Sequence, residues 1–180
     1  MKKTTLSLES HYWNPSHIGC PYALLCSCFE QADSAYYQTA LLAYQQYAQT
    51  TLTYPNTAIS TLIWDASVMQ SLFRAAYQIY CNPKVYQQNL AQPPQLMAKP
   101  KLVYLSKKEG KNPYLVFQQL FRTFSLEQMS QAFFDLILAT LDPDTKISST
   151  RHNVSPIHYL LVIEAAEVLH KRISPVGLLN

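Results

Sequence analysis

The chain has 180 residues, of which 48% are hydrophobic and only 14% are charged, against about 25% charged residues in ordinary globular proteins. This length suits one domain with a sizeable core. The three glycines are too few for Gly-rich phosphate loops or tight Asn-Gly hairpins, and the net charge of +3 does not by itself indicate nucleic-acid binding.

Hydrophobic residues recur at helical spacing in the first half of the chain. An irregular arm over about residues 1–20 precedes a predicted helix over 21–29, and a second helix is predicted over 32–49. The longest series of apolar residues, at the i, i+3, i+4 and i+7 positions of one helix face, runs from Ile59 to Tyr80. Asn82-Pro83 ends it.

The second half begins with a connector over about residues 82–112, which is rich in proline and lysine. Within it, Leu102–Leu105 could form one short strand without an obvious partner. Asn112-Pro113 predicts a helix start, and that helix stops near Phe124. Ser125 and Gln128 fit a capping box before the next helix, and Ser155-Pro156 starts the last one.

These elements predict an all-α fold, an irregular bundle of about five or six helices in a single domain over residues 1–180. Seven apolar side chains lie on the helical stripes and are expected in the core: Ile63, Phe73, Phe121, Phe133, Ile137, Leu160 and Leu161. Within the last helix, Glu164 and Glu167 are expected to lie away from this inner face.

The segment from Arg151 to His158 resembles the R-x4-6-H motif of the HEPN superfamily, whose helical members are often metal-independent ribonucleases. The resemblance implies that Arg151 contacts a phosphate and that His158 acts in acid–base cleavage. The segment departs from the pattern, because Pro156 falls inside the spacing and leaves Arg151 in the preceding loop. The alternative is a loop arginine and a histidine in the first helical turn.

Three cysteines and a histidine lie close together in the first thirty residues: His17, Cys20, Cys26 and Cys28. Zinc sites use such side chains. The spacing lacks paired C-x2-C elements, and on a helix Cys26 and Cys28 point about 200° apart. We therefore expect these thiols and Cys81 to be free, with no metal and no cofactor.

Basic residues gather in the connector: Lys99, Lys101, Lys107, Lys108 and Lys111. They are opposed only by Glu109, and Tyr104 and Tyr114 lie among them. Positive charge beside aromatic rings is what a nucleic-acid surface needs. Lys107, Lys108 and Lys111 are therefore candidate binding residues, with a solvated loop as the alternative.

No charged residue occurs between Ser34 and Trp64, and the span holds six aromatic residues: Tyr36, Tyr37, Tyr44, Tyr47, Tyr54 and Trp64. One helix cannot turn all of its aromatic side chains toward a single core, so some must face outward. Interface cores are poor in charge and rich in tyrosine and tryptophan. Tyr37 and Tyr44 are therefore candidate residues for self-association or partner binding, unless the rings simply lie along a wet surface.

The segment from Leu105 to Phe117, together with Glu164–Glu167, resembles a group of small helical bacterial proteins whose activity is unknown. That resemblance implies a bacterial origin and no site residues. The chain shows no apolar h-region after Lys3 and no apolar run of about 18 residues, so a cytoplasmic protein without membrane contact is expected.

Together these observations predict a non-enzymatic interaction or regulatory protein that binds a protein partner or a second copy of itself. The alternative is an HEPN-like ribonuclease or RNA-binding protein.

Overall fold

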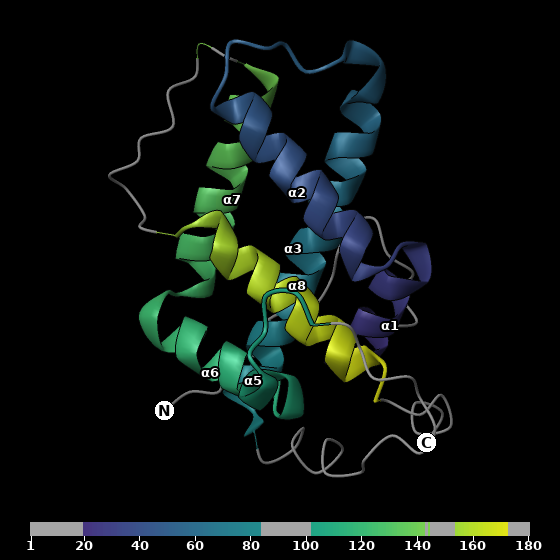
Figure 1. Ribbon diagram of the computed structural model, residues 1–180, viewed down its shortest axis with the longest axis vertical. Helices are drawn as coiled ribbons and strands as arrows, with labels where there is room; N and C mark the ends of the chain where they lie inside the picture. Colours follow the sequence, from purple (N-terminus) through teal and green to yellow (C-terminus); the bar gives the residue numbers. More distant parts are fainter. Residues whose placement is uncertain (1–19, 84–101, 143, 145–153, 173–180) are drawn as a thin grey trace.

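The computed structural model describes residues 20–83, 102–142, 144 and 154–172. These residues form seven α-helices and one 3-10 turn and no strand (Figure 1), which confirms the all-α prediction. The elements in chain order are α1 (Pro21–Gln31), α2 (Ser34–Ala48), η2 (Asn56–Ala58), α3 (Ile59–Cys81), α5 (Lys107–Lys111), α6 (Tyr114–Thr123), α7 (Leu126–Leu141) and α8 (Pro156–His170).

Local sequence signals fix several helix starts. Asp33 caps α2, because its carboxylate accepts a hydrogen bond from the Tyr36 N–H at 2.8 Å. The predicted capping box of α7 is present, with the Gln128 N–H donating to Ser125 Oγ at 3.1 Å and the Ser125 N–H donating to Gln128 Oε1 at 2.8 Å. Each bond satisfies an N–H that the helix itself leaves unpaired.

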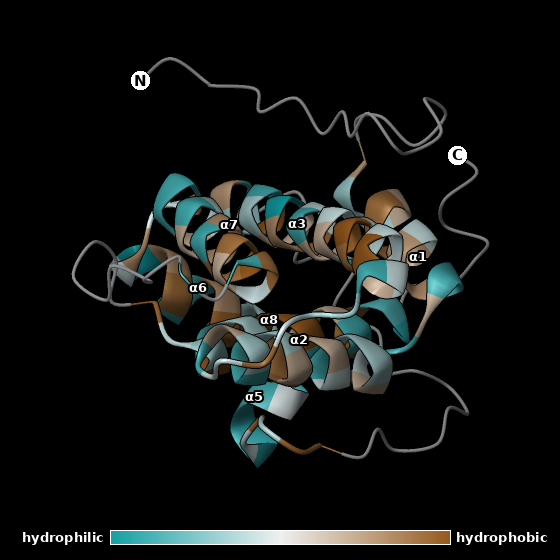
Figure 2. Cartoon of the chain, turned by 90° about the horizontal axis from the view of Figure 1, so that it is seen from above, coloured by the Kyte–Doolittle hydropathy of each residue, from teal (hydrophilic) through white to brown (hydrophobic). Residues whose placement is uncertain are grey.

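The long helices pack in two layers. Viewed from above, α1, α3 and α7 lie in one layer, and α2 and α8 lie across it in the second (Figure 2). The short helix α5 lies outside the second layer, where it contacts α6 and α8. The core therefore lies between the two layers, and α5 is an addition to the outside of α8.

Aromatic rings fill the middle of the core. Phe133 lies edge-on to Phe73 with ring centroids 5.4 Å apart, and Tyr159 lies 5.5 Å from Phe133. The Tyr159 hydroxyl donates to the Met129 carbonyl at 2.8 Å, so this buried phenol is satisfied. Five of the residues predicted to lie in the core are buried: Phe73, Phe121, Phe133, Ile137 and Leu160.

The core prediction is wrong for Ile63, which is 46% exposed, and Leu161 is only half-buried. The buried face of α3 passes through Leu62 and Asp65. Ile63 follows Leu62 by one residue, which turns it about 100° away from that face. Because Asp65 is polar, a search for hydrophobic residues alone does not identify the face of α3 that contains it as the buried one.

Candidate functional site

The predicted connector contains a short helix that its hydropathy does not reveal. We call residues 102–111 the strap. Its helix, α5, starts with a capping box in which the Glu109 N–H donates to Ser106 Oγ at 3.3 Å and the Ser106 N–H donates to Glu109 Oε2 at 2.8 Å. The suggested strand over Leu102–Leu105 is not formed. The Ser-x-x-Glu pattern was the available sequence signal for this helix.

The start of the strap is fastened to α8 by a buried carboxylate. Glu164 is 3% exposed, and its carboxylate accepts three backbone N–H bonds, from Val103 at 2.5 Å, Tyr104 at 2.7 Å and Leu105 at 2.9 Å. The spacing within α8 did not predict this burial, because the partners of Glu164 belong to the strap. Burial is tolerated here because charged acceptors form strong hydrogen bonds with peptide donors.

The end of the strap is fastened by an arginine. The Arg172 guanidinium, just beyond the end of α8, donates to the carbonyl oxygens of Gly110 at 2.5 Å and Lys111 at 3.0 Å. A cation is favourable at this end of α5, where the carbonyl groups carry partial negative charge. Gly110 also packs so closely on Leu102 that a Cβ at this position would overlap the leucine side chain.

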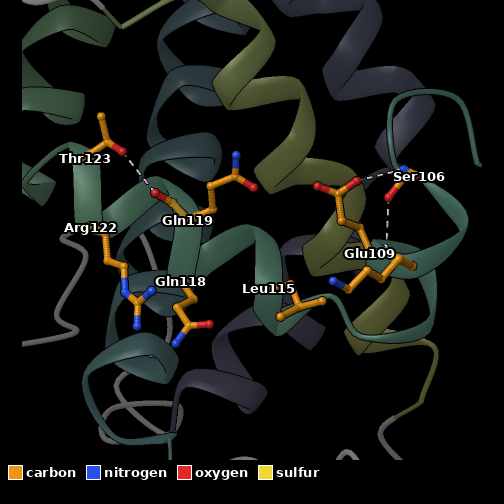
Figure 3. Close-up of a pocket in the computed structure, with 8 residues that line it drawn as sticks. Ser106, Glu109, Leu115, Gln118, Gln119, Arg122 and Thr123 are labelled. Atoms are coloured by element: carbon orange, nitrogen blue, oxygen red, sulfur yellow. Dashed lines mark hydrogen bonds between the residues drawn. The ribbon is translucent and has the colours of Figure 1, made fainter.

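A groove of about 450 Å³ lies between the strap and α6. The strap contributes Ser106, Lys108 and Glu109, and α6 contributes the remaining side chains (Figure 3). The residues from α6 are Leu115, Gln118, Gln119, Arg122 and Thr123. Seven of the eight lining residues carry polar or charged groups, among them two cations and two primary amides.

The charge around the groove is predominantly positive. Lys107, Lys108, Lys111 and Arg122 are all exposed, and none of them forms an ion pair with a described residue. The one carboxylate in the lining, Glu109, already accepts the Ser106 N–H of its capping box. The structure thus brings the three predicted lysines to one end of the molecule and adds Arg122, which sequence reasoning missed.

No aromatic side chain is among the described residues that line the groove. Tyr114 lies on α6 but is only 5% exposed, and its hydroxyl donates to the Tyr80 carbonyl at 3.2 Å. Single-stranded nucleic acids are held by bases stacked on aromatic rings as well as by charge. The prediction that the ring of Tyr114 lies beside the lysines on a nucleic-acid-binding surface is therefore wrong, because this ring is buried.

The proposed ribonuclease pair is only partly visible, because Arg151 lies outside the described residues. His158 lies in the first turn of α8, where its Nδ1 accepts the Ser155 N–H at 3.0 Å and its ring packs on Phe124 at 5.0 Å. Burial lowers the pKa of His158, because desolvation disfavours the charged imidazolium. This imidazole is thus a helix cap, and its role in cleavage stays a prediction.

The exposure predicted for two tyrosines is wrong. Tyr37 and Tyr44 are 1% and 3% exposed, so neither lies on a surface open to a partner. The Tyr44 hydroxyl donates to Asp65 Oδ2 at 2.7 Å, and Tyr36 donates to the same carboxylate at 3.1 Å. The aromatic residues of this span that do face outward are Tyr36 and Trp64. Self-association stays a prediction, and the two residues named for it, Tyr37 and Tyr44, are buried within this chain.

Cys20, Cys26, Cys28 and Cys81 are free thiols. Cys26 Sγ lies 3.4 Å from His170 Nδ1, a contact that a cysteine nucleophile would need. Burial, aided by the negative charge of Glu30, raises the pKa of Cys26 to about 11, and burial lowers the pKa of His170. Both groups are neutral near pH 7, so this pair is not an activated thiolate.

In the described part of the chain, no three His, Cys, Asp or Glu side chains could hold a metal ion together, and the predicted participant His17 lies outside it. No helix there is long and apolar enough to cross a membrane. Comparison of the chain with protein-family models, curated proteins and solved structures gives no match.

Proposed function

We propose that the protein is a non-enzymatic interaction protein that binds an acidic segment of a partner protein in the groove between the strap and α6. The observation that carries the proposal is the pair of exposed cations in the lining, Lys108 and Arg122, which form no ion pair with a described residue. Lys107 and Lys111, on the same short helix as Lys108, are exposed and have no such partner either. The lining holds one carboxylate, Glu109, against two cations, Lys108 and Arg122, so its net charge favours an acidic ligand.

The polar lining supports a peptide rather than a nucleic acid. Gln118 and Gln119 each offer an amide N–H2 and a carbonyl oxygen, which match the acceptors and donors of an extended peptide backbone. Arg122 presents the planar fork that binds a carboxylate through two hydrogen bonds. Aromatic rings for stacked bases are missing from the described lining.

The test is a fluorescence-anisotropy titration of the whole protein with three labelled ten-residue probes. These are a Glu/Gln peptide, a Lys/Gln peptide of the same length, and a single-stranded RNA. We expect binding of the acidic peptide only. Lys108→Gln and Arg122→Gln should each weaken it about five-fold, the value of about 1 kcal/mol expected for a partly exposed ion pair.

Lys171→Gln is the matched control. It removes the same charge outside the groove, where Lys171 pairs with Glu167 at 3.1 Å, and it should leave affinity within about two-fold. If Lys171→Gln and Lys108→Gln weaken peptide binding equally, binding depends only on the net charge of the protein, and the groove is not the binding site. RNA binding without peptide binding would favour the nucleic-acid alternative, and no binding of any probe would refute the site.

A further inference from the structure

Three successive peptide groups of the strap point at one side chain. The N–H groups of Val103, Tyr104 and Leu105 all donate to the Glu164 carboxylate, the first to Oε1 and the other two to Oε2. These residues lie in neither a helix nor a strand, so secondary structure does not use their N–H groups. Convergent backbone N–H groups of this kind form a concavity that binds anions.

The carboxylate of Glu164 forms no ion pair with a described residue, and its three printed partners are peptide N–H groups. A carboxylate offers about four lone-pair directions, of which three are occupied. Leu105, whose N–H lies closest to α5, is only 7% exposed, so water cannot readily replace the glutamate there. The peptide N–H groups therefore stabilise the buried negative charge of Glu164, and the carboxylate in turn satisfies these N–H groups.

We propose that residues 102–105 form a backbone anion-binding loop whose resident ligand is the Glu164 carboxylate, and that this contact positions the cationic wall of the groove. A chain without this carboxylate would leave a site for a small free carboxylate such as formate or acetate. The positioning part rests on the proposed function, whereas the anion-binding loop does not.

The contact between Glu164 and the strap lies next to the lysines of α5 and can therefore position them. Lys107 and Lys108 follow Leu105 directly, separated from it only by Ser106, the cap of α5. Arg172, eight residues beyond Glu164 and just past the end of α8, holds the other end of the strap. The strap is thus tied before and after Lys107 and Lys108, and loosening the first tie frees these two lysines from their place beside α6.

The experiment follows amide hydrogen exchange at residues 103–105 by NMR in the full chain, with Glu164→Ala and Glu164→Gln as variants. In the alanine variant we expect these amides to exchange at least ten-fold faster, while those of the α3 and α7 core stay protected. Acetate or formate at tens of millimolar should restore protection in a saturable manner. Acetamide, which has the same shape and no charge, should not.

Glu167→Ala is the matched control, because Glu167 lies on the same helix and binds Lys171 and the Ser34 N–H instead of the strap. Its amides at 103–105 should exchange as in the unaltered chain. Should Glu164→Ala fail to fold, Glu164→Gln decides, since it keeps the shape and loses the charge. Unchanged exchange in the glutamine variant, or equal rescue by acetate and acetamide, would overturn the proposal.

Binding of the acidic peptide separates the two proposals. We expect Glu164→Gln to weaken the peptide several-fold without changing the slope of affinity against salt, because no phosphate- or carboxylate-binding cation is removed. Lys108→Gln should lower both the affinity and that slope. If no peptide binds the unaltered chain, the proposed function fails, and the exchange and rescue measurements still test the anion-binding loop.

Discussion

Replacing Phe133 by alanine is the sharpest test of the core. The ring is fully buried on α7 and has two aromatic neighbours, Phe73 at 5.4 Å and Tyr159 at 5.5 Å. A buried Phe→Ala change costs about 3–5 kcal/mol through lost transfer energy and the cavity left behind. Each aromatic pair adds about 0.5–1.5 kcal/mol beyond the buried area. We therefore expect a loss near the top of that range, about 4–5 kcal/mol.

The assay is urea unfolding followed by circular dichroism, with the slope of free energy against urea compared between variants. Phe134→Ala is the control, because the next residue of the same helix is 49% exposed. It makes the same change in helix propensity and should alter the unfolding free energy by less than about 1 kcal/mol. A loss below about 1 kcal/mol for Phe133→Ala, or equal losses for both variants, would refute the assignment of the core face of α7.

Three further predictions concern polar and titratable groups. Tyr44→Phe removes a 2.7 Å hydrogen bond to the buried carboxylate of Asp65 and should cost about 1.5–3 kcal/mol in urea unfolding, while an unchanged midpoint would mean that water replaces the phenol. Burial lowers the pKa of both histidines of α8, so their neutral forms favour the fold. Their contribution to the free energy of unfolding should be complete above about pH 6.5 and should be lost as the pH falls through the lowered pKa values. In a variant with both histidines changed to glutamine, the free energy of unfolding should therefore fall less steeply toward acid pH. The thiol of Cys26 has a pKa of about 11, so at pH 8 it should react with a disulfide reagent on the order of 10²-fold more slowly than an ordinary cysteine. The exposed Cys81 should be labelled first, which peptide mass spectrometry can check.

Most of the fold follows from local patterns in the sequence. The apolar periodicity locates α3 and α7 to within a few residues, and Ser125 marks the start of α7. Ile63 was misplaced because the inner face of α3 includes Asp65, whose burial depends on hydroxyl groups from α2. A partner from another helix cannot be read from the spacing within one helix.

The candidate site was less predictable for the same reason. Its lysines stand out in the sequence, whereas Arg122 belongs to another helix, and only packing brings it beside them. The burial of Glu164 could not be predicted, because an acidic residue in a helix ordinarily faces water. Its ligands lie about sixty residues earlier in the chain, and only the fold brings backbone N–H groups to it.

The central position of α8 has a consequence for how the protein is made. This helix contacts α1, α2, α3, α5 and α6, and its Tyr159 also bonds to α7. A ribosome produces chains from the amino end, so α8 is the last of the described helices to emerge. Until then, the faces of α1, α2, α3 and α6 that pack on α8 lack this partner. Nascent chains halted before Pro156 should therefore be digested by protease, whereas those in which α8 has emerged should resist it.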